Sequence, residues 1–318
     1  MPIAILVGRN EDEKNQFHWF IADWKKSLLA LQPDLDIRIW PDIGNPDEVD
    51  YAMVWHPAHG VLRKLTRLKV IASLGAGVDH VFLDKELPAH IPIVRVIDPY
   101  MKNDIVQYVV SCVLHHVKRM DHWQELQRQK KWSKQPPFNL ADKTVGVMGV
   151  GILGGKAVEV MHEMGLHVIG WSNSPKKIAG ITHYHGKNQL PDFLAQTDIL
   201  ACMLPLTDAT RNILNRDTFS LMPEGAYIIN VGRGEHLVEA DLLAALASGQ
   251  LSGAALDVFR QEPLPPDHPF WLHDNIRITP HIASVTNPAT AAPQVLENYR
   301  RMQEGRSLIN EVDLTKGY

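Results

Sequence analysis

Several features that define common protein classes are rare in this sequence or absent from it. Among 318 residues there are only two cysteines, Cys112 and Cys202, which can form neither a disulfide framework nor, by themselves, a zinc site. No apolar run approaches the ~20 residues of a membrane span, and residues 3–7 lead directly into polar residues rather than a secretory signal. The 32 Lys and Arg against 36 Asp and Glu give a net charge of −4, which favours neither nucleic acid nor an acidic membrane as partner. We therefore expect a cytoplasmic protein that binds neither.

What the sequence does contain is an alternation of short apolar runs with longer amphipathic stretches, which is typical of βαβ units and parallel sheets. At roughly 100–200 residues per domain, the length suggests two domains. Strands are predicted at residues 3–7, 37–40, 51–55, 70–74, 93–96, 144–148, 167–171, 198–204, 226–231, 253–257 and 277–279. Helices are predicted at residues 17–31, 60–65, 105–120 and 289–303. The pattern predicts an α/β protein.

Two segments have unusual surfaces. Residues 105–120 are apolar nearly all round, and such a helix must be covered on several sides, so we expect another domain or another subunit to cover it. Residues 127–137 are polar, with four lysines and arginines followed by two prolines, and are predicted to form an excursion on the surface.

A glycine-rich loop, Gly149-Val150-Gly151-Ile152-Leu153-Gly154, follows one predicted strand and opens an amphipathic helix. By itself this spacing fits a tight turn as well. With a strand before it, a helix after it and the next strand ending about twenty residues on, it matches a dinucleotide-binding loop. The glycines allow backbone N–H groups to approach a pyrophosphate. We predict that Gly149, Gly151, Ile152, Leu153 and Gly154 bind the cofactor.

The loop after the next strand indicates which dinucleotide is bound. An NAD site would normally have Asp or Glu here for the ribose hydroxyls, but this chain has Ser172-Asn173-Ser174-Pro175-Lys176-Lys177. Hydroxyls, an amide and two lysines can accept a 2′-phosphate, whereas a carboxylate would repel it. We predict NADP(H) as the preferred cofactor, with NAD(H) possible, and contacts from Ser172, Asn173, Ser174, Lys176 and Lys177. The alternative is a solvated loop without cofactor preference.

Polar residues follow the carboxyl ends of three further predicted strands. Arg233 follows residues 226–231, Glu262 follows residues 253–257, and His281 follows residues 277–279. Ligands of open α/β sheets bind beyond these strand ends. Each residue alone has a plain alternative, as an exposed turn arginine, a solvated acid or a structural histidine. Together, beside a dinucleotide loop, they predict a redox site.

The chemistry of a 2-oxo acid reduction assigns roles to these three residues. The guanidinium of Arg233 can pair with the carboxylate and ketone oxygens of the substrate and polarise the ketone. His281 is the candidate general acid that protonates the developing alkoxide. Glu262, if paired with His281, would fix the tautomer of the imidazole. No metal site is expected, since neither His56 with His59 nor His183 with His185 lies among further ligands.

A second glycine turn, Gly75-Ala76-Gly77, also follows a predicted strand, and its N–H groups could bind the substrate carboxylate. A turn that requires positive φ would explain its glycines equally well. Trp55, His56, Tyr100 and Met101 are predicted to line a pocket for a small 2-oxo acid. The predicted substrate contacts are Trp55, Gly75, Ala76, Gly77, Arg233 and His281.

In several segments the chain resembles the D-isomer-specific 2-hydroxyacid dehydrogenase family. The matching motifs, in the order of that family, are Gly75-Ala76-Gly77-Val78-Asp79, Gly149 to Gly154, Asn230-Val231-Gly232-Arg233-Gly234, Leu256-Asp257-Val258-Phe259, Glu262-Pro263-Leu264-Pro265 and Thr279-Pro280-His281. The resemblance implies that Arg233, Glu262 and His281 are catalytic and that Asp257 faces the nicotinamide carboxamide. The predicted cofactor contacts also include Leu204, Pro205, Val231 and Ser284.

The resemblance also implies an architecture and an activity. It implies two doubly wound parallel-sheet domains, with a Rossmann cofactor domain (residues 101–286) inserted in a flavodoxin-like substrate domain (residues 1–100 and 287–318), and a homodimer formed through the cofactor domain. Val54-Trp55-His56-Pro57, Trp171-Ser172 and the ending at 312–318 are similar to members that use NADPH to reduce glyoxylate to glycolate and hydroxypyruvate to D-glycerate. Two alternatives remain: an NAD(H)-dependent dehydrogenase for another 2-oxo acid, and a cofactor-sensing interaction protein on the same fold.

Overall fold

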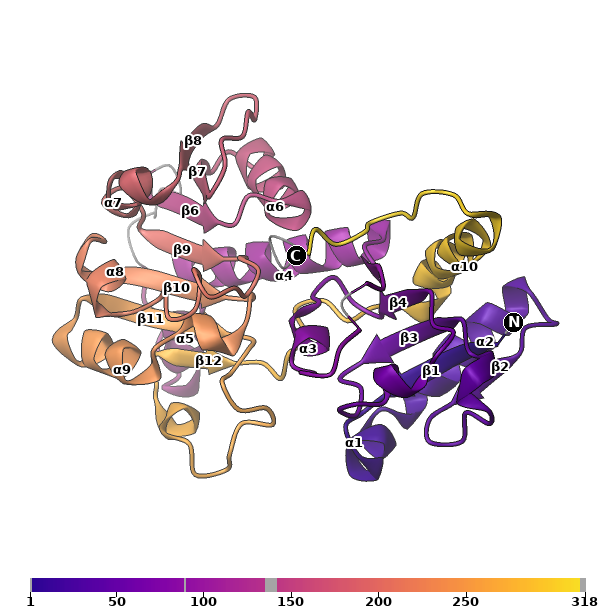
Figure 1. Cartoon of the computed structure of the whole chain (residues 1–318). Coiled ribbons are helices and arrows are strands. Elements are labelled where there is room, and N and C mark those ends of the chain that lie inside the picture. Colours follow the sequence, from indigo (N-terminus) through magenta and orange to yellow (C-terminus); the bar gives the residue numbers. More distant parts are fainter. Residues whose placement is uncertain (1, 89, 135–141, 315–318) are drawn as a thin grey trace. The chain divides into compact units, whose positions relative to one another are not determined.

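The chain folds into two compact α/β units, each built on its own parallel sheet (Figure 1). This computed structural model describes residues 2–88, 90–134 and 142–314. Unit 1 comprises Met1–Met101 and Val285–Tyr318, and unit 2 comprises Lys102–Ser284.

Unit 1 contains a five-stranded sheet in the order β2-β1-β3-β4-β5, with every pair parallel. This is the strand order of flavodoxin-like folds. Apolar residues on both sides of the strands fit a sheet that is covered on both faces. The strands are β1 (Ile3–Val7), β2 (Ile37–Ile39), β3 (Tyr51–Trp55), β4 (Val70–Ser73) and β5 (Ile93–Arg95).

The two faces of this sheet are covered by different kinds of elements. One face packs against α2 (His18–Leu31) and α10 (Pro288–Glu304), which returns from the end of the chain. The other packs against shorter elements, among them α3 (Asp79–Phe82) and a single 3₁₀ turn. That turn covers only Leu62–Lys64, so the longer helix predicted for residues 60–65 is wrong. A short helix that was not predicted, α1 (Glu11–Gln16), precedes α2.

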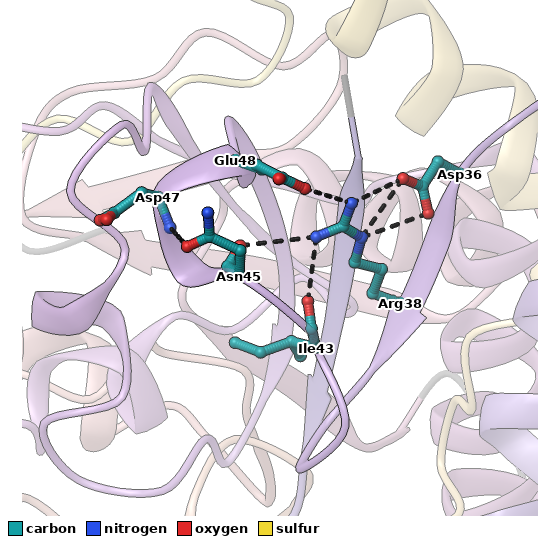
Figure 2. Close-up of polar contacts among 6 residues, drawn as sticks. All are labelled: Asp36, Arg38, Ile43, Asn45, Asp47 and Glu48. Carbon is teal, nitrogen blue, oxygen red and sulfur yellow. Dashed lines mark hydrogen bonds and ion pairs between the residues drawn. The ribbon is translucent and has the colours of Figure 1, made fainter.

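An arginine cluster fixes the edge of this sheet beside β2 (Figure 2). The guanidinium of Arg38 donates to the carboxylates of Asp36, at 2.9 Å, and Glu48, at 2.6 Å. It also donates to the backbone carbonyls of Ile43, at 3.2 Å, and Asn45, at 3.4 Å. All three guanidinium nitrogens are thus engaged in tying the loop after β2 to the strand, which gives this cluster a structural role.

Unit 2 contains a seven-stranded parallel sheet in the order β12-β11-β10-β9-β6-β7-β8. Six of these strands have the 3-2-1-4-5-6 order of a Rossmann fold, and β12 extends the sheet. The order reverses between β6 and β9, and ligands of such sheets bind at this switch point. The strands are β6 (Thr144–Met148), β7 (His167–Ser172), β8 (Thr182–His185), β9 (Ile199–Cys202), β10 (Ala226–Asn230), β11 (Leu251–Leu256) and β12 (Ile276–Ile278).

Helices cover both faces of the sheet of unit 2. The long helix α4 (Pro99–Val117) and α6 (Ile152–Glu163) pack on one face. The helices α7 (Leu190–Leu194), α8 (Arg216–Ser220) and α9 (Glu239–Ser248) pack on the other. Ile105, Val109, Val113 and Val117 of α4 are buried against the sheet of unit 2. The sheet of its own unit thus covers this stripe, whereas Tyr108, Val110 and Cys112 on other sides of the helix are only half-buried.

Strand β8 was not predicted from the sequence. Its residues, Thr-His-Tyr-His, are polar or aromatic, and the strand lies at the sheet edge with no fully buried member. An edge strand is less buried than a central strand and needs fewer apolar residues. The alternation of apolar and polar residues in this segment is therefore weak. The helix α5 (Met120–Arg128) was likewise not predicted. Residues 127–134 are exposed, as expected for a surface excursion, whereas 135–137 of that segment lie outside the described residues.

Two features are absent from the described residues. No helix within residues 2–88, 90–134 and 142–314 has the length and apolar character needed to cross a membrane. In the same part of the chain, no group of three or more His, Cys, Asp or Glu side chains is arranged to hold a metal ion.

Candidate active site

The predicted cofactor and catalytic residues of unit 2 gather at one edge of its sheet. All seven strands are parallel, so the loops at their carboxyl ends leave the sheet on the same side. The loops after six strands carry the predicted residues: Gly149, Gly151, Ile152, Leu153 and Gly154 after β6; Ser172, Asn173, Ser174, Lys176 and Lys177 at the end of β7; Leu204 and Pro205 after β9; Val231 and Arg233 after β10; Asp257 and Glu262 after β11; His281 and Ser284 after β12.

Glycine is needed at each of the three glycine positions of the loop after β6, for a different structural reason at each. Gly149 has a φ of +108°, and a Cβ on it would lie 2.7 Å from the carbonyl of Met203, beyond β9. A Cβ on Gly151 would meet nothing within 4 Å, so the backbone there borders open space. A Cβ on Gly154 would lie 2.1 Å from the carbonyl oxygen of Gly149. These are the three requirements of a dinucleotide loop: a tight turn, close approach of a pyrophosphate, and close packing of the helix.

The helix that follows this loop has an N-terminus suited to an anion. No side chain caps α6 at Gly151, and no acidic residue lies in its first turn. The first N–H groups of a helix lack partners within the helix, and the helix dipole favours negative charge near them. Ile152 in this first turn is 51% exposed although it is apolar. An uncapped N-terminus beside open space fits the pyrophosphate of a dinucleotide.

Neighbouring glycines in α6 provide a test of this packing. We expect Gly154→Ala to destabilise unit 2 by roughly 1–3 kcal/mol or more, because the new methyl group would overlap the Gly149 carbonyl. Gly155→Ala is the matched control, since its Cβ would meet nothing closer than 3.9 Å and alanine favours a helix by up to about 1 kcal/mol. Urea denaturation of both variants measures the difference, and equal stabilities would contradict the close packing.

The loop at the end of β7 is organised around a histidine of β8. The hydroxyl of Ser172 donates to the carbonyl of Ser174 at 2.8 Å and lies 2.9 Å from Nε2 of His183. The backbone N–H of Lys176 donates to Nδ1 of the same imidazole at 3.3 Å. Ser172 is 9% exposed, whereas residues 173–177 are exposed. The hydroxyl of Ser172 is thus used within the loop, and the exposed polar groups lie beyond it.

Arg233 lies in the turn after β10 and is half-buried rather than fully exposed. Its backbone N–H donates to Nδ1 of His236 at 3.0 Å, and its carbonyl accepts from the amide of Asn230 at 3.0 Å. Its Nη1 donates to the carbonyl of Gly232 at 2.7 Å. A Cβ on Gly234 would lie 1.9 Å from the carbonyl carbon of Phe259, which explains why glycine is required there.

Glu262 and His281 form a hydrogen-bonded pair. Nδ1 of His281 lies 2.7 Å from one carboxylate oxygen of Glu262, and the other oxygen accepts the Phe259 N–H at 2.9 Å. Burial alone would raise the pKa of Glu262. The hydrogen bond and charge of His281, the Phe259 N–H and the charge of Arg233 outweigh burial, so this pKa lies below its ordinary value. Because the carboxylate accepts from Nδ1, the other ring nitrogen, Nε2, is the one that can interact with a further partner.

Asp257 shapes the loop that carries His281. The carboxylate is 1% exposed and accepts from the Thr279 hydroxyl at 2.6 Å and from the N–H groups of Ile282 at 2.9 Å and Ala283 at 2.8 Å. The hydroxyl of Tyr108, on α4, donates in turn to Thr279. His281 has a φ of +54°, which non-glycine residues rarely adopt, and this network compensates for the strain. Its bonds within the loop occupy both carboxylate oxygens of Asp257.

The predicted substrate residues of unit 1 lie at the carboxyl edge of its own sheet. Trp55 ends β3, and Gly75, Ala76 and Gly77 follow β4. A turn that requires positive φ was one explanation for the glycine at position 75. Gly75 does not have a positive φ, so that explanation is wrong for this residue. A Cβ on Gly75 would instead lie 2.7 Å from the indole of Trp55. The glycine therefore allows the Trp55 ring to lie directly against the loop.

A buried histidine supports this glycine loop. Nδ1 of His80 accepts the His56 N–H at 3.3 Å, and its Nε2 lies 3.1 Å from the Ser73 hydroxyl. That hydroxyl donates to the Gly77 carbonyl at 2.7 Å. Among the other predicted pocket residues, Tyr100 is exposed, but Met101 is 3% exposed within the core of unit 1. The prediction that Met101 lines the pocket is corrected.

Several residues that shape these sites were not identified from the sequence. Asn230 and Thr279 lay inside the motifs, but no pattern assigned them a partner. Tyr108, His183 and His236 carry no local signal, because each contacts residues that are distant in the chain. His236 illustrates this, since its Nε2 lies 3.3 Å from the Pro205 carbonyl, in the loop after β9.

The fold and the site together define a class of protein. A Rossmann sheet with a dinucleotide loop at its switch point, and with an acid–histidine pair and an arginine at the same edge, is typical of nicotinamide-dependent oxidoreductases. The glycine loop, the uncapped helix and the Arg233–Glu262–His281 group lie on the same unit.

Comparisons with known proteins narrow this class to a family. The family described as D-isomer specific 2-hydroxyacid dehydrogenase, NAD binding domain, matches residues 110–283. Glyoxylate/hydroxypyruvate reductase A of Yersinia enterocolitica is 43% identical over 301 residues, which cover 93% of this chain and 96% of that protein.

Solved structures of similar chains agree. A D-isomer specific 2-hydroxyacid dehydrogenase from Xanthobacter autotrophicus Py2, in complex with NADPH and MES, has a TM-score of 0.92 and 40% identity, covering 100% of this chain and 99% of its own. The NADPH-dependent glyoxylate/hydroxypyruvate reductase from Sinorhizobium meliloti, in complex with NADP and sulfate, has a TM-score of 0.89 and 33% identity, with coverage of 100% and 99%.

This chain therefore belongs to the D-isomer specific 2-hydroxyacid dehydrogenase family. The predicted family and the predicted α/β fold class, with a Rossmann cofactor-binding domain, are confirmed.

Proposed function

We propose that this protein reduces small 2-oxo acids by hydride transfer from NADPH, converting glyoxylate to glycolate and hydroxypyruvate to D-glycerate. The observation that carries the proposal is the His281–Glu262 pair with Arg233 at the edge of the Rossmann sheet that also carries the dinucleotide loop. The names of the similar proteins from Yersinia enterocolitica and Sinorhizobium meliloti support the choice of substrates.

The residues around the loop after β6 fit a dinucleotide. The open space at Gly151 and the uncapped N-terminus of α6 suit a pyrophosphate. When bound, the nicotinamide supplies the hydride for the carbonyl carbon of the substrate. Asn173, Ser174, Lys176 and Lys177 offer polar and cationic groups to a 2′-phosphate, and no carboxylate of this loop would repel it. The neighbours solved with NADPH or NADP support this choice of cofactor.

The three residues of the edge have separate tasks in this reduction. The guanidinium of Arg233 pairs with the carboxylate and ketone oxygens, so negative charge that develops on the ketone oxygen meets a fixed cation. Nε2 of His281 gives its proton to that oxygen, which becomes the product hydroxyl. Glu262 orients the imidazole through Nδ1 and balances the charge of the imidazolium before the transfer.

Unit 1 contributes a second group of residues to the proposal. The backbone N–H groups of Ala76 and Gly77 are suited to a carboxylate, whereas that of Gly75 donates to Ser73 Oγ at 3.4 Å. The Trp55 ring lies against this loop. In this proposal unit 1 is the substrate-binding domain and unit 2 the cofactor-binding domain.

The resemblance further leads us to propose a cytoplasmic homodimer. Sedimentation analysis of the purified protein would test the dimer.

Initial rates of cofactor oxidation test the proposal directly. With glyoxylate and with hydroxypyruvate, we expect kcat/KM to be at least about tenfold higher for NADPH than for NADH, because a charged phosphate gains roughly 1.4 kcal/mol or more from cationic partners. Preference for NADH would contradict the 2′-phosphate site but leave the catalytic residues in place. Absence of turnover with either cofactor, in protein that binds NADP⁺, would contradict the proposed reaction.

A further inference from the structure

His183 occupies the centre of a chain of hydrogen bonds that closes the loop at the end of β7. A backbone N–H can only donate, so the Lys176 N–H, 3.3 Å from Nδ1, requires Nδ1 to accept. The proton of the neutral imidazole is then on Nε2, which donates to Ser172 Oγ at 2.9 Å. The Ser172 hydroxyl passes its own proton to the Ser174 carbonyl at 2.8 Å. Every donor and acceptor in this chain is thus assigned without ambiguity.

The surroundings of His183 keep the imidazole in this neutral form. Burial lowers its pKa, and the charges of His185 and Lys176 lower it further. The residue beside it on β7 is Gly170, where a Cβ would lie 3.3 Å from Cδ2 of the imidazole. The sheet therefore leaves room for the ring at this position, and the ring bridges β8 to the loop.

The loop that His183 closes is the one that distinguishes the two nicotinamide cofactors in the proposed function. Ser172 is buried and its hydroxyl hydrogen is used by Ser174, so the groups left to meet a phosphate are the exposed residues 173–177. The N–H of Lys176 is fixed by His183, which sets where the backbone places the Lys176 and Lys177 side chains. Lysine is a flexible point charge, so its contribution depends on a fixed backbone.

We propose that His183 is a positioning residue for recognition of the 2′-phosphate of NADP(H), acting by closing the loop of residues 172–176 and not by touching the phosphate. This inference rests on the proposed function. It assigns part of the cofactor selectivity to β8, the edge strand that carries His183, which lies outside the loop itself.

The test uses two ligands that differ only in the group at issue, 2′,5′-ADP and 5′-AMP, with affinities measured by calorimetry on the full-length protein at pH 8. We expect His183→Leu to weaken 2′,5′-ADP by roughly five- to tenfold, the equivalent of one or two hydrogen bonds, and to leave 5′-AMP unchanged. His183→Gln, which can both accept and donate, should recover affinity to within about threefold of the wild-type protein. Thr182→Val, at an exposed position of the same strand, is the matched control and should change neither ligand.

Three outcomes would overturn the inference. If His183→Leu retains the wild-type preference for 2′,5′-ADP, the loop does not depend on the histidine. If it weakens both ligands equally, or lowers the melting temperature in parallel with affinity, its role is general stability. If the wild-type protein does not prefer 2′,5′-ADP over 5′-AMP, both the proposed NADPH preference and this inference are wrong. The measurement on the wild-type protein alone reveals that result.

Discussion

Replacing His281 with Asn is expected to lower kcat for glyoxylate reduction by about 10²–10⁴-fold, the usual contribution of a general acid or base. Without the imidazole, the proton for the substrate oxygen must come from water. Asn is preferred to Ala as the test because His281 has a φ of +54°, which Asn tolerates better than other non-glycine residues. The backbone loop, which is fixed by Asp257, should then be retained.

The measurement is kcat under saturating NADPH, together with NADP⁺ affinity, which should remain within about twofold of the wild-type value, well under 1 kcal/mol. His90→Asn, an exposed histidine of unit 1, is the matched control and should retain full activity. A variant at His281 that keeps more than a tenth of wild-type kcat would show that another group donates the proton. Loss of NADP⁺ binding in parallel would instead indicate damage to the fold of the site.

Replacing Arg233 with Ala should reduce kcat by about 10²–10³-fold, the cost of removing one fixed stabiliser of an oxyanion. KM for the 2-oxo acid should also rise, because in the proposed function the guanidinium pairs with the substrate carboxylate in both ground and transition states. Arg233→Lys keeps the charge but loses the planar fork, so we expect it to recover only part of the activity. The turn is fixed by Asn230 and His236 through backbone atoms of residue 233, which the substitutions leave in place.

Steady-state kinetics of the two variants, with and without added guanidinium, separates the roles. Rescue of Arg233→Ala by guanidinium would place the missing cation at the substrate, whereas a purely structural defect would not respond. Arg216→Ala, whose side chain is 78% exposed at the start of α8, is the control. A fall in kcat/KM of less than tenfold in Arg233→Ala would contradict the assigned role.

The sequence predicted much of the local structure of this site. The run of small and apolar residues around Gly149, with a strand before it and a helix after it, predicted the dinucleotide loop, and the structure gives each glycine a separate reason. The polar residues at strand ends predicted that Arg233, Glu262 and His281 share one edge, because parallel strands end on the same side. The pairing of Glu262 with His281, on which the role assigned to Glu262 was conditional, is present in the structure.

Other features depended on which elements become neighbours in the sheet. The positions of His236 beside Pro205, and of Tyr108 beside Thr279, join segments 31 and 171 residues apart in the chain. Strand β8 was missed because an edge strand of Thr, His and Tyr has too little apolar periodicity. The sequence also does not show that Met101 is buried, because its cover in the core of unit 1 comes from residues distant in the chain.

The sequence by itself determined the class of fold, the position of the cofactor loop and the chemical types available for catalysis, since these follow from periodicity and spacing within about twenty residues. Only the tertiary structure decided the partners of His183, His236 and Asp257, and with them the shape of the loops at the proposed cofactor and substrate sites. The physical reason is that a hydrogen bond depends on distance and angle between two groups, and strand order brings distant groups together in a way that no local pattern records.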